Sequence, residues 1–126
     1  MTPKLYIVPT PIGNLEDITL RALRILNEVD KIYAEDTRVT IKLLSHYDIK
    51  KPLISFHDHN STVKIEAVLN DLENGLTVGL VSDAGMPLVS DPGYDLVRKV
   101  LERNYNVVSL PGANALLPAL TMSGIK

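Results

Sequence analysis

Hydrophobic residues recur along the chain in two alternating patterns. Short runs of aliphatic and β-branched residues, typical of strands buried on both faces, are followed by stretches with helical spacing of apolar positions. The runs are residues 5–8, 31–34, 52–56, 77–81 and 106–110. Strands that alternate with helices form a parallel sheet joined by right-handed crossovers. The pattern therefore predicts an α/β fold, an open parallel five-stranded sheet with flanking helices.

Helical spacing is clearest in the third intervening stretch, where Ile65, Val68, Leu69 and Leu72 follow an i, i+3, i+4, i+7 pattern. The sequence Glu-Asn-Gly at 73–75 then predicts the end of this helix, with Gly75 in the left-handed conformation. Residues 113–122 predict a last helix. Parts of the same spacing return at Leu20, Leu23 and Leu26, at Ile41 and Leu44, and at Val97, Val100 and Leu101.

Composition narrows the class of protein. A chain of 126 residues without an internal boundary or repeat predicts one domain, residues 1–126, close to the lower size limit for an α/β enzyme. The absence of cysteine excludes disulfides and cysteine nucleophiles and fits a reducing, cytoplasmic location. No apolar run reaches the roughly 20 residues that span a bilayer, and no secretory signal is expected before the first strand.

The formal net charge of −2 argues against broad, nonspecific binding of nucleic acid. An RNA substrate would therefore require a basic surface that is local, or one that lies elsewhere in a longer protein.

Chemically distinctive residues follow every predicted strand. They occupy residues 9–14, 35–38, 57–60, 82–93 and 111–114, whereas the loops at 74–75 and 103–104 are plain turns. Open parallel sheets bind ligands at the carboxyl ends of their strands. This asymmetry predicts a binding site at that edge of the sheet.

The first of these loops, Pro-Thr-Pro-Ile-Gly, contains Pro9, Pro11 and Gly13. It lacks the G-x-G-x-x-G of dinucleotide-binding and ordinary Rossmann methyltransferase loops, and no P-loop lysine follows. Those two kinds of nucleotide binding are therefore not expected. A rigid connection from strand to helix would account for the prolines in this loop alone.

The second loop places Glu35, Asp36 and Arg38 after a strand. One interpretation has Asp36 or Thr37 capping the next helix while Arg38 is solvated. The other gives Arg38 a bidentate contact with a phosphate and gives one of the two carboxylates a role as proton acceptor.

The fourth loop, residues 82–93, combines two Asp-containing clusters with two glycines and two prolines, and places Asp83 at the strand tip. The simpler interpretation is a stiff loop with Ser90 or Asp91 as a helix cap.

At the third strand, His57 and His59 flank Asp58, but no third metal ligand is evident, so a polar strand end is expected rather than a metal site. Asn60 or Ser61 can cap the helix that follows.

Five segments together resemble the branch of the class III, tetrapyrrole-methylase-like S-adenosylmethionine enzymes that methylates small-subunit ribosomal RNA on a ribose hydroxyl. The resemblance extends over residues 6–124 and is carried by residues 8–15, 34–38, 57–60, 82–93 and 110–114. It implies S-adenosylmethionine as cofactor and small-subunit ribosomal RNA, or the assembled subunit, as partner. Glu35, Asp36 and Arg38 would then be catalytic.

The resemblance also implies the residues that contact the cofactor. They are Pro9, Pro11, Gly13, Ser82, Asp83, Ala84, Gly85, Met86, Pro111, Gly112, Asn114 and Ala115. Similar proteins continue into a second domain that closes over the cofactor, and we expect a homodimer of the full-length protein. Two alternatives remain open: a methylase acting on a tetrapyrrole, and a non-catalytic module that binds ligand or dimerises.

Overall fold

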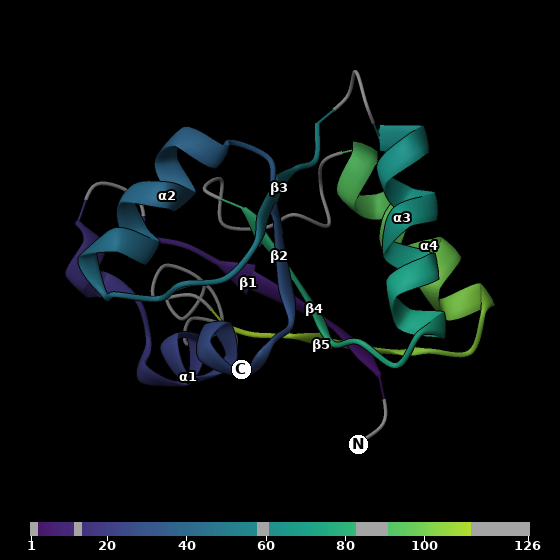
Figure 1. Cartoon of the computed structure of the whole chain (residues 1–126), viewed down its shortest axis with the longest axis horizontal. Coiled ribbons are helices and arrows are strands. Elements are labelled where there is room, and N and C mark those ends of the chain that lie inside the picture. The colour runs from purple at the N-terminus through teal and green to yellow at the C-terminus, as the bar shows by residue number, and fades with distance from the viewer. Residues whose placement is uncertain (1–2, 12–13, 58–60, 83–90, 112–126) are drawn as a thin grey trace, which may run out of the picture.

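A computed structural model describes residues 3–11, 14–57, 61–82 and 91–111 of the chain. Figure 1 shows a central sheet with helices on both sides. In chain order the elements are β1 (Lys4–Pro9), the 3-10 helix η1 (Leu15–Asp17), α1 (Leu20–Glu28), β2 (Lys31–Ala34), α2 (Thr37–His46), β3 (Leu53–Ser55), α3 (Ser61–Glu73), β4 (Val78–Ser82), α4 (Asp91–Glu102) and β5 (Asn106–Ser109).

The five strands form one sheet in the order β3-β2-β4-β1-β5, and every pair is parallel. The predicted fold class is confirmed, and each strand begins and ends within one residue of its predicted range. β3 is the shortest, yet hydrogen bonds extend its pairing with β2: the Ile32 amide donates to the Pro52 carbonyl and the Phe56 amide to the Ala34 carbonyl, at 2.9 and 2.8 Å.

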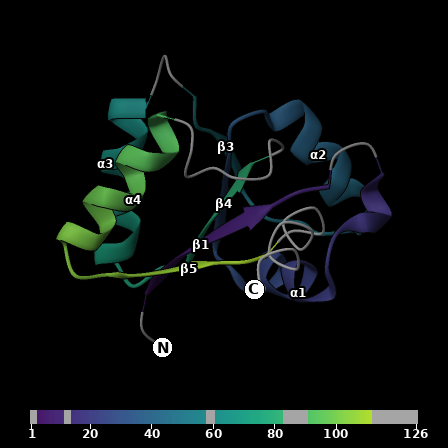
Figure 2. The same ribbon diagram turned by 180° about the vertical axis from the view of Figure 1, so that it is seen from behind.

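Two hydrophobic layers enclose the sheet. α1 and α2 contribute Leu26 and Leu44 to the layer on one face, which contains Val8 and Val81 of the sheet. α3 and α4 pack on the other face, where alternate strand residues such as Leu5 and Leu80 point. Figures 1 and 2 show the two helix pairs on opposite sides of the strands. The alternation buries both faces, as the aliphatic strand sequences predict.

Three residues expected on buried helix faces are exposed instead, and one of them is Ile41 of α2, which is 50% exposed. Leu20 is 85% exposed, because Thr19 caps α1 and leaves Leu20 as the first helical residue, outside the stripe that faces the sheet. Leu101 is 53% exposed, because the buried stripe of α4 runs through Leu96 and Val100. Within the described residues, no helix is long and apolar enough to span a membrane.

The turn after α3 forms as predicted. Gly75 has φ +85°, and the amides of Gly75 and Leu76 donate to the carbonyls of Leu72 and Asp71, each at 3.0 Å. A Cβ at Gly75 would meet nothing within 4 Å, so the backbone conformation, and not lack of space, favours glycine here.

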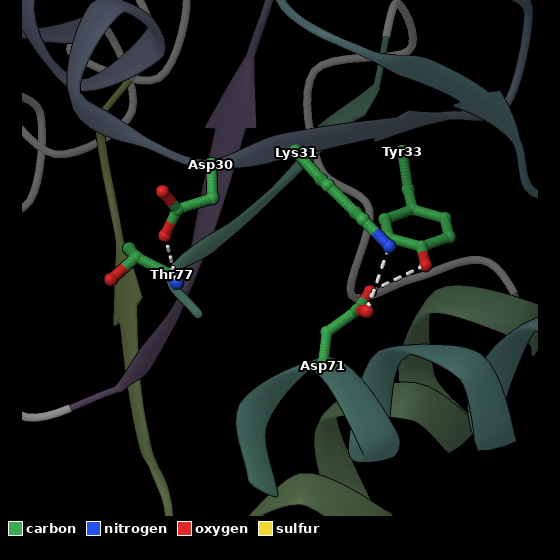
Figure 3. A network of polar contacts seen from close by, with 5 residues as sticks. All are labelled: Asp30, Lys31, Tyr33, Asp71 and Thr77. Atoms are coloured by element: carbon green, nitrogen blue, oxygen red, sulfur yellow. Dashed lines mark hydrogen bonds and ion pairs between the residues drawn. The ribbon is translucent and has the colours of Figure 1, made fainter. Parts of the chain in front are cut away.

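A buried polar network that the sequence patterns do not reveal joins α3 to β2 (Figure 3). The Asp71 carboxylate accepts hydrogen bonds from Lys31 Nζ at 2.8 Å and from the Tyr33 hydroxyl at 2.7 Å. The Asp71 side chain is 8% exposed. Burial, together with the hydrogen bond to Asp71 and its charge, raises the pKa of Tyr33. Nearby, the Asp30 carboxylate accepts a hydrogen bond from the Thr77 amide at 2.8 Å. This bond holds the residue before β4 against the residue before β2.

We expect Asp71→Ala to lower the free energy of unfolding of the chain by about 2–3 kcal/mol, because it leaves a buried hydroxyl and a half-buried ammonium without their acceptor. Glu73→Ala removes an exposed carboxylate from the same helix, bound to Arg103 at 2.9 Å, and should cost about 1 kcal/mol or less. Urea denaturation of the two variants measures the difference. Equal losses would contradict a stabilising role for the network.

Candidate functional site

The carboxyl ends of β1, β2 and β4 meet at one edge of the sheet. Pro9 pairs with Ser82, and Ala34 pairs with Val81. The amide of Glu35 donates to the Val81 carbonyl at 3.4 Å, so Glu35 lies directly beside the end of β4. Asp83 is the next residue along the chain after Ser82. The fold therefore brings the second and fourth loops of the sequence prediction to neighbouring strand ends.

β2 and β4 also diverge in their connections. The chain leaves β2 toward β3 at one edge of the sheet, and it leaves β4 toward β5 at the other. Adjacent parallel strands with diverging connections define the topological switch point, where open α/β sheets bind their ligands. Glu35 follows one of these two strands and Asp83 the other. This arrangement depends on strand order, which periodicity along the sequence does not reveal.

The loop after β1 is held from two sides. Pro9 is buried, Thr10 is 7% exposed and takes part in a noncovalent interaction, and Pro11 is half-buried. The Asn14 side chain accepts from the Glu16 amide at 3.0 Å and caps η1. The Tyr47 hydroxyl, at the end of α2, donates to the Leu15 carbonyl at 2.8 Å. This hydrogen bond joins the end of α2 to the start of η1, and the sequence did not predict it, because no local pattern marks Tyr47 as a donor to Leu15.

Asp36, and not Thr37, caps α2. Its Oδ1 accepts from the Arg38 amide at 3.0 Å and lies 3.5 Å from Arg38 Nε. Desolvation alone would raise the pKa of Asp36, but the hydrogen bonds from the Arg38 backbone and side chain, with the positive charge of Arg38, lower it overall. A carboxylate with a lowered pKa is a weaker proton acceptor. The cap therefore gives Asp36 a structural role at the site edge.

Arg38 and Glu35 differ in their surroundings. The Arg38 side chain is 90% exposed, and its contact with Asp36 is long and open to water, so the guanidinium can meet an external anion. Glu35 is half-buried at the switch point and takes part in a noncovalent interaction. The two side chains therefore occupy distinct positions, Glu35 at the sheet edge and Arg38 on the solvent side of α2.

At the remaining strand ends, His57 is half-buried after β3, and Pro111 is exposed after β5. The Leu110 amide donates to the Ile7 carbonyl at 2.9 Å and holds the end of β5 against β1. Among the residues that the structure describes, no three His, Asp or Glu side chains are grouped as metal ligands.

Several expected site residues lie outside the described residues, and so does the whole of the predicted helix at 113–122. They are Gly13, Asp58, His59, Asn60, Asp83, Ala84, Gly85, Met86, Gly112, Asn114 and Ala115.

Residues 4–126 match the family model of the tetrapyrrole (corrin/porphyrin) methylases. Cobalt precorrin-4 methyltransferase, a cobalamin biosynthetic enzyme, superposes with a TM-score of 0.72 at 20% identity, covering 86% of this chain and 45% of that one. Uroporphyrin-III C-methyltransferase from Thermus thermophilus, solved with S-adenyl homocysteine, gives a TM-score of 0.60 at 23% identity, with 86% and 44% covered. Both likenesses show the shared fold.

Sequence relatives are much closer. Proteins named ribosomal RNA small subunit methyltransferase I from Halalkalibacterium halodurans and Haemophilus influenzae are each 54% identical, over 96% and 99% of this chain. The one from Thermotoga maritima is 55% identical over 96% of the chain. The chain covers 42%, 44% and 54% of these relatives, so it spans about half of their length. The family match over nearly the whole sequence and the superposed folds agree, and the chain belongs to the tetrapyrrole (corrin/porphyrin) methylase family.

Proposed function

We propose that this chain is the amino-terminal domain of an enzyme that methylates the ribose 2′-hydroxyl of a cytidine in small-subunit (16S) ribosomal RNA, using S-adenosylmethionine. The identity of about 54% with relatives named for small-subunit ribosomal RNA methylation carries the proposal. The solved tetrapyrrole methyltransferases are far more distant, at 20–23% identity, which disfavours a tetrapyrrole substrate. A carboxy-terminal domain completes the site, and the full-length enzyme forms a homodimer in the cytoplasm.

The cofactor occupies the carboxyl edge of the sheet. Its contacts come from the loops after β1, β4 and β5, with the methionine part and the sulfonium facing residues 83–86. The described edge suits this ligand, because Glu35, whose backbone lies at the switch point, carries a half-buried carboxylate of the charge that complements the positive sulfonium. The contact residues are Pro9, Pro11, Gly13, Ser82, Asp83, Ala84, Gly85, Met86, Pro111, Gly112, Asn114 and Ala115.

Three residues of the second loop share the catalytic work. S-adenosylmethionine, when bound, supplies an electrophilic methyl group. Glu35 orients the ribose hydroxyl and accepts its proton, because its side chain lies at the switch point and does not serve as the helix cap. Asp36 keeps its lowered pKa, stays ionised, and holds the first turn of α2 in place. Arg38 binds a phosphate of the RNA from the solvent side.

A methylation assay tests the function. The full-length polypeptide that contains this chain is incubated with small ribosomal subunits, or with a tetrapyrrole, and with S-adenosylmethionine labelled in its methyl group. We expect label in the ribosomal RNA, at a 2′-oxygen, and none in the tetrapyrrole. Label in the tetrapyrrole alone would replace the proposal with the alternative substrate.

In the same assay, we expect Arg38→Ala to lower methylation of the subunits about tenfold or more while cofactor affinity stays nearly unchanged. A hydrogen bond to a charged group contributes about 1.5–3 kcal/mol, and here it acts on the nucleic-acid side. Arg98→Ala, which removes a half-exposed guanidinium from α4, is the matched control. Titration calorimetry with S-adenosylmethionine separates the two effects. Loss of cofactor affinity with intact RNA binding would mean that Arg38 is misassigned.

A further inference from the structure

The α3–α4 pair and the segment around α2 differ sharply in charge. α3 and α4 carry six carboxylate side chains and three cationic ones. Residues 37–52, which comprise α2 and the segment leading to β3, carry four cationic side chains and a single carboxylate. Figure 1 shows α2 and the α3–α4 pair on opposite sides of the sheet. The net charge of −2 therefore includes the charges of a basic side, around α2, and of an acidic side, on α3 and α4.

Each side contains both ion-paired and unpaired cations. On the acidic side, Arg98 is bound to Glu102 at 3.1 Å, and Arg103 to Glu73 at 2.9 Å. Lys42 and Lys51 form no ion pair with any residue in the described part of the chain. Cations without intramolecular partners are the ones available to an anionic ligand. Lys42 and Lys51 offer this charge beside a single carboxylate, whereas Lys64 and Lys99, which also form no ion pair in the described part of the chain, lie among the six carboxylates of α3 and α4.

The basic residues of α2 form a line that starts at the candidate site. Arg38, Lys42 and His46 recur every four residues, so they follow one slowly turning row along α2, with a rise of about 6 Å per step. Lys50 and Lys51 lie beside the same helix, because they line a shallow cavity of about 340 Å³ together with Ile41 and Ser45 of α2. We call Arg38, Lys42, His46, Lys50 and Lys51 the α2 basic stripe.

We infer that the α2 basic stripe binds the phosphate backbone of the ribosomal RNA that leads away from the methylated nucleotide. The inference rests on the proposed function, and it adds the surface that an RNA substrate requires on an acidic protein. α2 begins at Thr37, directly after its cap Asp36 and close to the switch point, so RNA whose reacting ribose lies beside Glu35 passes Arg38 first and then Lys42. Phosphate contacts of this kind fix register and orientation without reading sequence.

Charge reversal on the stripe tests the inference. In the full-length polypeptide, Lys42→Glu with Lys51→Glu should weaken binding to small ribosomal subunits and to deproteinised 16S ribosomal RNA by tenfold or more at low salt. The salt dependence of binding should become shallower by about two phosphate contacts. S-adenosylmethionine affinity, measured by calorimetry, should not change. Lys42→Gln with Lys51→Gln should give a smaller loss in the same direction and covers the case in which the reversed variant does not fold.

The matched control reverses two cations on the acidic side, Lys99→Glu with Arg103→Glu, and changes the net charge by the same amount. We expect it to bind both RNA probes nearly as well as the wild type. Equal losses in the two double variants, or no loss in either, would overturn the inference while leaving methylation by the wild type intact. A loss with subunits but not with deproteinised RNA would also overturn it, in favour of a ribosomal protein contact. A wild type that binds neither probe would instead overturn the proposed function.

Discussion

Asp83→Ala is expected to abolish or strongly weaken S-adenosylmethionine binding by the full-length polypeptide while leaving it folded. Asp83 follows Ser82, the last residue of β4, in the sequence, and β4 is one of the two strands that define the switch point. Removal of a charged hydrogen-bond acceptor from a ligand costs about 1.5–3 kcal/mol, which corresponds to roughly a 10- to 150-fold loss of affinity. The strand itself should persist, because its buried residues Val78, Leu80 and Val81 lie in the hydrophobic layers.

Titration calorimetry with S-adenosylmethionine, alongside circular dichroism, measures the effect. Asp48→Ala is the matched control, since its carboxylate is 87% exposed in the turn after α2. That variant should bind the cofactor like the wild type. Unchanged affinity in a folded Asp83→Ala variant would remove the fourth loop from the proposed cofactor site.

The 126-residue chain by itself is expected to fold but not to methylate. Its two hydrophobic layers are built entirely from its own helices and strands, which supports independent folding. The candidate site, however, lies along one edge of the sheet. Methyl transfer needs the sulfonium and the hydroxyl held at attack distance and shielded from water, which an edge of this kind does poorly. We expect turnover of ribosomal subunits below one hundredth of the full-length rate, since misplacement by about 1 Å can cost a hundredfold.

Cooperative urea unfolding of the 126-residue chain tests the first half of this prediction. Incubation with labelled S-adenosylmethionine and small ribosomal subunits, beside the full-length polypeptide, tests the second half. Turnover comparable to that of the full-length polypeptide would show that the proposed second domain is dispensable.

Local sequence patterns were sufficient for the elements and the fold class. Aliphatic runs predict all five strands to within one residue, and the spacing of Ile65, Val68, Leu69 and Leu72 predicts the buried face of α3. The glycine at position 75 correctly predicts the turn that ends α3, because the left-handed φ of a helix end depends only on the few residues around it. The patterns misplaced Leu20, Ile41 and Leu101, since the rotation of a short helix on the sheet is set by packing and not by its own apolar residues.

The residue types at the site were also recognisable in the sequence, but their division of roles was not. Both Asp36 and Thr37 are good helix caps, and hydrogen-bond geometry alone selects Asp36, which leaves Glu35 beside the end of β4. The Asp71 network joins residues about 40 positions apart, so no local window contains it.

The sequence by itself determined the alternation of strands and helices, the turns, and the placement of distinctive residues after strands. These features follow from interactions within a few residues, namely backbone propensity, capping and periodic burial. The tertiary structure alone decided the strand order, and with it the meeting of Glu35 with the end of β4 and the separation of the basic and acidic sides. Those features depend on which strands pair across the sheet, and pairing is settled by the packing of the whole core, which the local pattern leaves open.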